Sequence, residues 1–167
     1  VRPFNKKLVK QGFMSLANKG GIYLGLKINY ENIGIFNCHL ASGTNKNAFK
    51  KRTENLAELE DYLEERQNLS LKFIMGDFNF RNQIDINQFY YLLSEYKSKK
   101  TNYEKMEILD QIKKGDEFLE VKLESNIIKG FIENPIEFLP SYKWTKNDEV
   151  YNYQEGKRTP SWTDRII

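Results

Sequence analysis

The segment FIMGDFNFR (73–81) places a carboxylate and a carboxamide at the end of a short apolar run. Gly76 would let the backbone turn sharply, and Asp77 and Asn79 would project from one face if the chain stays extended. An aspartate can bind Mg²⁺ or orient a nucleophilic water, and an asparagine can donate to a phosphate oxygen. The same pattern also fits an Asx turn that caps a strand.

Two further residues have the chemistry to join such a site. His39, the only histidine, lies near the end of the apolar run 33–40 and could donate a hydrogen bond to a phosphate oxygen. Asp164 could orient a catalytic imidazole, as the carboxylate of a triad does. Each residue also has a structural interpretation: a core histidine, and a surface Asp164–Arg165 pair beside a core Trp162.

A basic and partly aromatic cluster consists of Tyr142, Lys143, Lys157 and Arg158, which flank the polar loop 145–156. Two strands joined by that loop would bring the Tyr-Lys and Lys-Arg pairs together. Lysine binds phosphate as a point charge and arginine as a fork. The alternative is a solvated charged hairpin.

The loop GFMSLANKGG (12–21) carries Phe13, Met14 and Leu16 between glycines. These side chains would belong to the core or, if the loop is exposed, could enter the apolar part of a bilayer interface.

The elements that must position these residues follow from hydrophobic periodicity. Apolar β-rich runs predict antiparallel strands at 22–28 and 33–40, and another strand at 71–77. Helical spacing predicts a surface helix over 45–67. The pattern also predicts helices at 86–97, 103–113 and 116–122, with a helix stop at Gly115, and a final strand in 161–167. The order indicates a layered α/β or α+β domain.

Composition sets outer bounds. The chain has 167 residues, 40% of them hydrophobic, which is typical of one globular domain. A net charge of +3 does not indicate a nucleic-acid partner. A single cysteine fits a reducing, cytoplasmic compartment, and no apolar run approaches the roughly 20 residues that span a bilayer. The N-terminus lacks the apolar centre of a signal peptide and an initiator methionine, so we expect a fragment of something longer.

The order of these motifs resembles the inositol polyphosphate 5-phosphatases of the endonuclease/exonuclease/phosphatase superfamily, from about Gln11 to the last residue. GDFNFR resembles the family's Gly-Asp-Leu-Asn-Tyr-Arg, and PSWTDRI resembles its Pro-Ala-Trp-Cys-Asp-Arg-Ile. The resemblance implies a partial two-sheet β-sandwich with outer helices, formed by a single, incomplete catalytic domain over 1–167. It also implies Mg²⁺-dependent hydrolysis of the 5-phosphate of phosphatidylinositol phosphates or inositol polyphosphates.

The resemblance also implies roles for individual residues. Asp77 and Asn79 would position the attacking water and bind the scissile phosphate, His39 would contact that phosphate, and Asp164 would orient a second histidine. The family's contacts to the neighbouring 4-phosphate fall on Tyr142, Lys143 and Arg158, with Lys157 beside them. Arg81 and Arg165 would pair with carboxylates, and the role of Arg52 stays open.

Two parts of the family's site have no counterpart in these residues. Its metal-binding glutamate would precede Val1, and its Ser-Asp-His motif would follow Ile167. We therefore expect the isolated chain to be inactive or severely impaired. The lipid substrates of the family also suggest peripheral contact with membranes. The alternatives are a non-catalytic phosphoinositide-binding remnant and another superfamily hydrolase, such as a nuclease or sphingomyelinase.

Overall fold

The computed structural model describes the chain except for residues 1, 12–18, 125–126, 145–150 and 152–157. The chain divides into two compact units, and each is treated by itself below. The first unit comprises Val1–Asn79, Glu124–Asn134 and Asp164–Ile167. The second unit comprises Phe80–Leu123 and Pro135–Thr163.

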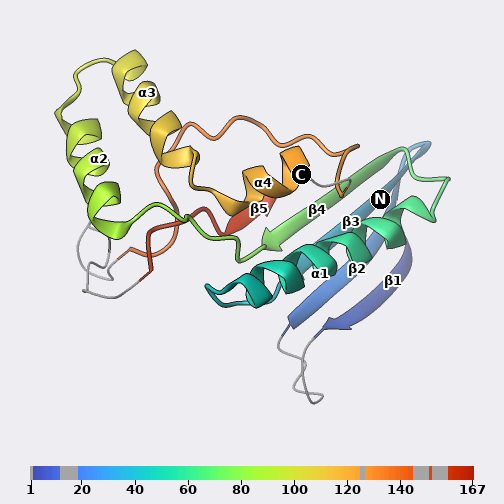
Figure 1. Cartoon of the computed structure of the whole chain (residues 1–167). Helices are drawn as coiled ribbons and strands as arrows, with labels where there is room; N and C mark the ends of the chain where they lie inside the picture. Colours follow the sequence, from blue (N-terminus) through green and yellow to red (C-terminus); the bar gives the residue numbers. More distant parts are fainter. Residues whose placement is uncertain (1, 12–18, 125–126, 145–150, 152–157) are drawn as a thin grey trace. The chain divides into compact units, whose positions relative to one another are not determined.

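The first unit is built on a five-stranded mixed sheet with strand order β1-β2-β3-β4-β5 (Figure 1). The strands are β1 (Arg2–Gln11), β2 (Lys19–Ile28), β3 (Glu31–His39), β4 (Leu71–Asp77) and β5 (Asp164–Ile166). All neighbouring pairs are antiparallel except β3 and β4, which run parallel. A parallel pair needs a crossover connection, and the helix α1 (Lys46–Glu64) provides it.

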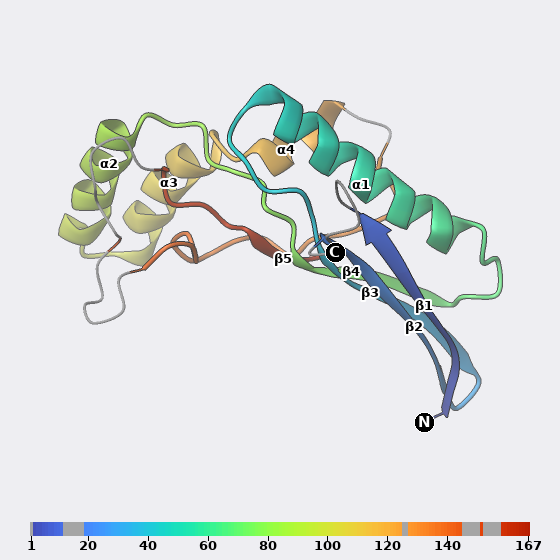
Figure 2. The ribbon, with the colours of Figure 1, turned by 90° about the horizontal axis from the view of Figure 1, so that it is seen from below.

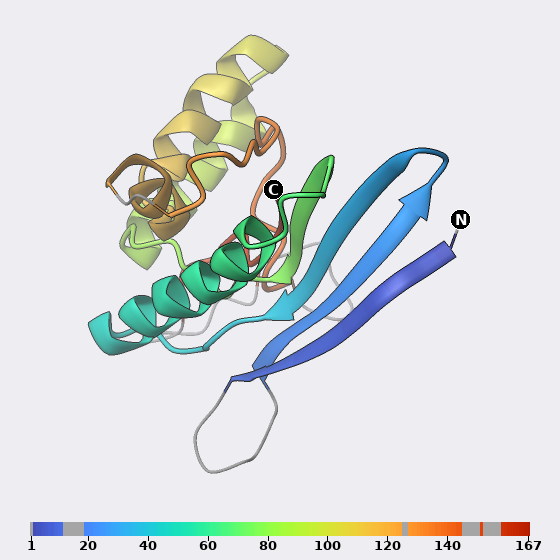
Figure 3. The same ribbon diagram turned by 90° about the vertical axis from the view of Figure 1, so that its right-hand side faces the viewer.

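Helix α1 covers one face of this sheet, as Figures 2 and 3 show. Asn45 caps the helix by accepting a hydrogen bond from the Ala48 N–H at 2.8 Å. The helix buries an apolar stripe that includes Leu56, Leu59 and Leu63. This stripe packs on Tyr23 of β2 and Phe36 of β3, whose rings also contact each other.

The opposite face of the sheet within the first unit holds exposed apolar side chains. Ile22 is 57% exposed, Leu71 49% and Ile166 62%. The register places these residues on the same face as the odd-numbered residues of β3, which include His39. The expected mixed α/β fold is confirmed, and the described residues of this unit form one sheet of the expected sandwich.

The second unit holds two helices that lie side by side, α2 (Ile86–Ser98) and α3 (Asn102–Lys113) (Figure 1). It also includes most of α4 (Glu117–Glu124). Asp85 caps α2, and Thr101 and Glu104 form a capping box on α3. The core of this unit gathers aromatic and aliphatic side chains, among them Phe89, Leu109 and Trp162.

Most predicted elements are confirmed, with three differences. Residues 2–11 form strand β1, which the sequence did not indicate. Lys19 and the two following glycines belong to β2, whereas the pattern indicated a turn there. The last strand is limited to Asp164–Ile166.

Candidate active site

Four polar residues of the first unit meet where strands β3 and β4 end. The register pairs His39 with Asp77, and Asp77 with Asp164, so these three side chains lie side by side across adjacent strands. Asn79 follows two residues after Asp77. Carboxyl ends of parallel strands are where sheets of this kind bind ligands. All four predicted catalytic residues therefore belong to one unit and one end of its sheet, which we call the sheet-end row.

The His39 ring lies between groups of opposite charge. Its Nε2 is 3.3 Å from Oδ2 of Asp77, and the Lys19 ammonium also contacts Nε2. The side chains of His39 and Asp77 are 49% and 35% exposed, so both remain accessible to a ligand. Lys19 was not among the predicted site residues. The signal that would have found it is register, because its neighbour Gly20 pairs with His39.

Asn79 reaches the row by a turn rather than by strand alternation. The strand ends at Asp77, and Asn79 adopts a left-handed φ of 57°. Its N–H donates to Oδ1 of Asp77 at 2.9 Å, which is the Asx-turn contact. Its Nδ2 donates to the Leu40 carbonyl at 3.1 Å. The expectation that Asp77 and Asn79 share a face by alternation is wrong, because the chain leaves the extended conformation between them.

Gly76 makes this arrangement possible. Its φ is 122°, a conformation that residues with a side chain rarely adopt. A Cβ at this position would lie 2.1 Å from the carbonyl oxygen of Cys38. The close approach of β4 to β3 therefore requires glycine immediately before the functional carboxylate, as the sequence indicated.

The direct pairing of Asp77 with Asp164 is unfavourable for stability alone. Like charges directly opposite each other on neighbouring strands destabilise a sheet. Asp164 is exposed and Asp77 half-buried. On the β3 side of this pair, His39 Nε2 lies 3.3 Å from Oδ2 of Asp77, so a group that can carry a positive charge faces it.

The described ranges of the chain contain no group of three or more His, Cys, Asp or Glu residues that could hold a metal ion. Asp77 and Asp164 offer the oxygen donors that Mg²⁺ prefers. These two carboxylates by themselves do not make a complete metal site.

Cys38 lies one residue before His39, on the opposite face of β3. Its side chain is 5% exposed. Burial, together with the negative charge of Asp77, raises the pKa of the Cys38 thiol to about 12. The thiol is therefore protonated at neutral pH and has no part in the chemistry of the row.

The predicted basic cluster belongs to the second unit. Tyr142 and Ser161 exchange both backbone hydrogen bonds, at 3.0 and 2.7 Å. This bridge ties Tyr142 and Lys143 to the segment that begins at Arg158. Lys143 and Arg158 are exposed, and Tyr142 is half-buried with the Arg81 guanidinium 5.1 Å from its ring centre. A phosphate-binding surface needs cations that solvent can reach. Lys143 and Arg158 meet this requirement.

Some expectations fall elsewhere. Lys157 and the apolar residues Phe13, Met14 and Leu16 lie outside the described residues. Arg165 pairs with Glu133 at 2.9 Å, both nearly buried, which confirms the expected carboxylate partner.

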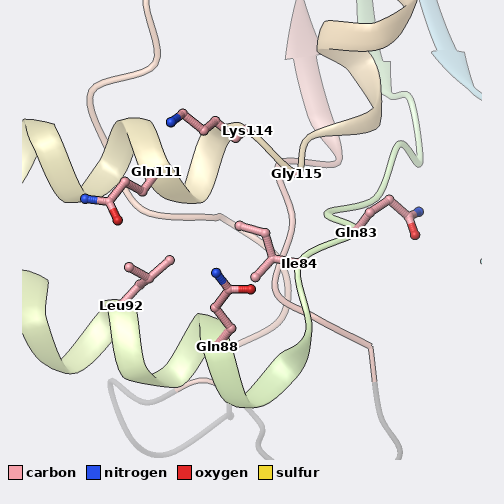
Figure 4. A pocket seen from close by; sticks show the side chains of 7 residues that line it. All are labelled: Gln83, Ile84, Gln88, Leu92, Gln111, Lys114 and Gly115. Atoms are coloured by element: carbon pink, nitrogen blue, oxygen red, sulfur yellow. The ribbon is translucent and has the colours of Figure 1, made fainter.

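A separate open cavity of about 330 Å³ lies beside α2 and α3 in the second unit (Figure 4). Glutamines dominate its polar lining, and Ile84 and Leu92 supply apolar surface. Gln83 is engaged with Glu117 at 2.5 Å. None of the predicted site residues lines this cavity.

Among the described residues, none of the helices combines the length and the hydropathy of a membrane span.

The first unit is a mixed sheet with a crossover helix on one face. One end of the sheet carries a histidine, an asparagine and two aspartates. This combination is that of an endonuclease/exonuclease/phosphatase type of domain. The chain belongs to the Endonuclease/Exonuclease/phosphatase family 2, whose model matches residues 1–167. The resemblance stated from the motifs is thereby confirmed at the level of the family.

The curated relatives of this chain include named 5-phosphatases and synaptojanin-1. The chain is 31% identical over 177 residues to human phosphatidylinositol 3,4,5-trisphosphate 5-phosphatase 2, covering 95% of this chain and 13% of that protein. It is 31% identical over 163 residues to mouse inositol polyphosphate 5-phosphatase K, covering 90% and 31%. It is 27% identical over 156 residues to rat synaptojanin-1, covering 90% and 9%. The chain thus spans less than a third of each of these relatives.

Solved structures share the fold. The chain superimposes on the inositol polyphosphate 5-phosphatase domain of SPsynaptojanin, solved with inositol (1,4)-bisphosphate and calcium, with a TM-score of 0.75 at 23% identity; the match covers 96% of this chain and 45% of that one. It also superimposes on Cimex nitrophorin, solved as a ferrous NO complex, with a TM-score of 0.72 at 20% identity, covering 97% and 51%. Since proteins with such different ligands share the fold, the fold alone does not fix the function.

Proposed function

We propose that this chain is part of the catalytic domain of a phosphatase that removes the 5-phosphate from phosphatidylinositol phosphates or inositol polyphosphates. The observation that carries the proposal is the pairing of His39, Asp77 and Asp164 across β3, β4 and β5. Strand register brings together residues from three distant parts of the sequence, at the end of the sheet where ligands bind. The 5-phosphatase names of the relatives favour inositides as the substrate class.

Each residue of the row has a role that suits phosphoryl transfer to water. Asp77 would hold the attacking water with a remaining lone pair of its carboxylate, whose Oδ1 accepts the Asn79 N–H and whose Oδ2 lies 3.3 Å from His39 Nε2. His39, half-exposed beside Asp77, would donate to an oxygen of the scissile phosphate. Asn79 would bind the same phosphate, and Asp164 would orient a histidine from outside this chain. In-line positioning of water and phosphate is the main requirement of such a reaction.

Substrate selection would fall to the basic cluster. Lys143 and Arg158 are exposed cations on two segments that the Tyr142–Ser161 bridge joins. An ammonium, a guanidinium and a phenol together suit a phosphate on the inositol ring next to the reacting one. Lys157, adjacent in sequence, would add a further positive charge.

We propose Mg²⁺ as the cofactor, with coordination completed by residues outside this chain. When bound, the ion would neutralise charge on the phosphate oxygens. Asp77 and Asp164 are direct partners in the register of β4 and β5, and their carboxylates would supply oxygen donors. We also propose a cytoplasmic protein that contacts membranes peripherally when it acts on lipid substrates, and that does not bind nucleic acid.

The decisive experiment compares the 167-residue chain with the same chain extended by its flanking coding sequence. Phosphate release from inositol (1,4,5)-trisphosphate and from phosphatidylinositol (4,5)-bisphosphate vesicles is measured with Mg²⁺ and with EDTA. We expect Mg²⁺-dependent turnover in the extended protein and less than about 1% of it in the chain alone, because loss of a catalytic imidazole costs about 100-fold or more.

Other outcomes identify the alternatives. Saturable inositide binding without hydrolysis in the extended protein would favour a non-catalytic binding module. Hydrolysis of DNA or sphingomyelin without inositide turnover would favour another member of the superfamily. Equal turnover in the chain alone would show that the missing glutamate and histidine are dispensable.

A further inference from the structure

Arg52 is a fully buried cation in α1 whose role the motifs leave open. Its side chain has 0% exposure, although it occupies an otherwise charged and solvated helix. Removing a guanidinium from water is costly unless its N–H groups find acceptors. The helix itself does not require a charge at this position, because its other buried residues are uncharged: Asn55, Leu56, Leu59, Tyr62 and Leu63. The acceptors of Arg52 therefore indicate what it is for.

Two of those acceptors are carbonyl groups of the loop that joins β3 to α1. Nη1 of Arg52 lies 2.8 Å from the Gly43 carbonyl oxygen and 3.4 Å from that of Ala41. The loop also packs tightly on the helix: Gly43 has a φ of 126°, and a Cβ there would lie 2.7 Å from Cβ of Ala48. Arg52 thus fixes the path of the chain from Ala41 to Gly43.

This path continues directly from the sheet-end row. Leu40, which follows His39, donates its N–H to the Asp77 carbonyl at 2.9 Å and accepts a hydrogen bond from Asn79 Nδ2 at 3.1 Å. One residue therefore connects the histidine, the aspartate and the asparagine through its backbone. A shift of the loop would move the Leu40 carbonyl and, with it, the carboxamide of Asn79.

We propose that Arg52 is a positioning residue for the hydrolysis, acting through the backbone of residues 40–43 to hold His39 and Asn79 in place. This inference rests on the proposed function. The action of Arg52 is transmitted by the carbonyl groups of Ala41 and Gly43, to which it donates. A group of this kind affects the rate of the chemical step more than the binding of substrate, because displacement by about 1 Å from productive geometry costs roughly 100-fold.

The kinetic test substitutes Arg52 in the extended protein. Arg52→Met keeps most of the aliphatic part of the side chain and removes its donors, and Arg52→Lys retains a charged donor group. We expect kcat to fall about 10- to 100-fold in Arg52→Met with KM within about twofold, and Arg52→Lys to recover part of the loss. Unchanged kcat in a folded Arg52→Met protein would overturn the proposal.

Arg66, just beyond the other end of α1, provides the matched control. Its guanidinium also donates to a backbone carbonyl, that of Tyr62, and stacks 3.3 Å from the centre of the Tyr62 ring. Arg66→Met removes a comparable cation far along the helix from the row. We expect it to lower stability and leave kcat unchanged. An equal loss of kcat in both variants would reduce Arg52 to a general stabilising role and overturn the proposal.

A second measurement does not depend on turnover. In the 167-residue chain, amide hydrogen exchange of Leu40 reports its bond to Asp77, and the carboxamide NMR signals of Asn79 report its bond to Leu40. We expect faster Leu40 exchange and shifted Asn79 signals in Arg52→Met but not in Arg66→Met. Unchanged exchange and signals would overturn the positioning role. Absence of inositide turnover in the unsubstituted extended protein would instead overturn the proposed function.

Discussion

The two groups of candidate functional residues are held in different ways. The sheet-end row is fixed by strand register, so that His39, Asp77 and Asp164 are neighbours because their backbones are hydrogen-bonded partners. The basic cluster has a single bridge, Tyr142 with Ser161, and its cations extend into solvent. Chemistry needs fixed geometry, whereas recognition of a charged ring tolerates side chains that adapt. We therefore expect substitutions in the row to change kcat and those in the cluster to change KM.

The largest effect should come from Asp77. Replacing it with asparagine keeps an acceptor for the Asn79 N–H and removes the charge beside His39. In the extended protein we expect kcat to fall about 100- to 10,000-fold, the range for loss of a positioned general base. Initial rates of phosphate release at saturating inositide measure this. Asp61→Asn, an exposed carboxylate on α1, is the control, and a similar rate in both variants would contradict the assignment.

The next largest effect should be on stability, at Gly76. Alanine would be strained at a φ of 122°, and its Cβ would meet the Cys38 carbonyl. We expect Gly76→Ala to lower the free energy of unfolding by about 2–3 kcal/mol. Urea titration followed by circular dichroism checks this value. Gly130→Ala, where a Cβ meets nothing within 4 Å, should change stability little. Equal stability of the two variants would mean that β3 and β4 tolerate separation at the row.

A smaller effect is expected in the basic cluster. Arg158→Gln should raise KM for an inositide bisphosphate about tenfold with kcat within twofold, since a charge-assisted hydrogen bond contributes roughly 1.5–3 kcal/mol. The increase should shrink at high salt, because the lost interaction is between exposed charges. Lys114→Gln, an exposed cation of the same unit, is the control. A fall in kcat without a rise in KM would remove the distinction between row and cluster.

The smallest effect concerns Glu60 of α1, away from both groups. Its Oε1 accepts the Ile128 N–H at 2.6 Å, and partial burial raises the pKa of its carboxyl above 4.5. A raised pKa in the folded state means that the protonated form is favoured there, so this contribution to stability is present below pH 4.5 and is lost as pH rises through the folded pKa. Glu60→Gln should therefore be slightly more stable than the unsubstituted chain at pH 7.

This difference should vanish below pH 4.5, where the glutamate is protonated in both states. Thermal unfolding at pH 4 and pH 7 measures it. Glu58→Gln, on an exposed part of the same helix, is the control. A Glu60→Gln variant that is less stable at pH 7 would contradict this prediction. It would indicate that the hydrogen bond from the Ile128 N–H to the charged carboxylate stabilises the fold by more than the burial of that charge costs.

Local sequence patterns were sufficient to predict most of the elements. Helix α1 has apolar residues at helical spacing and Asn45 as its cap, and β4 is a short apolar run that ends in Gly-Asp. Strand β1 escaped prediction because RPFNKKLVKQ lacks a long apolar run. It lies at the edge of the sheet, where lysines are tolerated and even discourage pairing with other chains. Edge strands are thus hard to recognise from hydrophobicity alone.

The candidate site was only partly predictable. Residue types singled out His39, Asp77, Asn79 and Asp164, but the pairing of His39, Asp77 and Asp164 depends on two long-range strand registers that no local pattern specifies. Lys19 was missed because its contact with His39 spans a hairpin. Of the two interpretations of Asp77 and Asn79, strand alternation is wrong and the Asx turn is present, with Asn79 bonded to Asp77 and Leu40. Asparagine tolerates the left-handed φ that this turn requires.

The buried sulfhydryl of Cys38 in β3 is a built-in chemical probe of local opening in the sheet. With its pKa at about 12, Cys38 carries almost no thiolate at neutral pH and lies behind the very strands that hold the row. An alkylating reagent can modify it at an appreciable rate only when those strands transiently part. The rate of labelling would therefore report how often this region of the sheet opens, without any engineered probe.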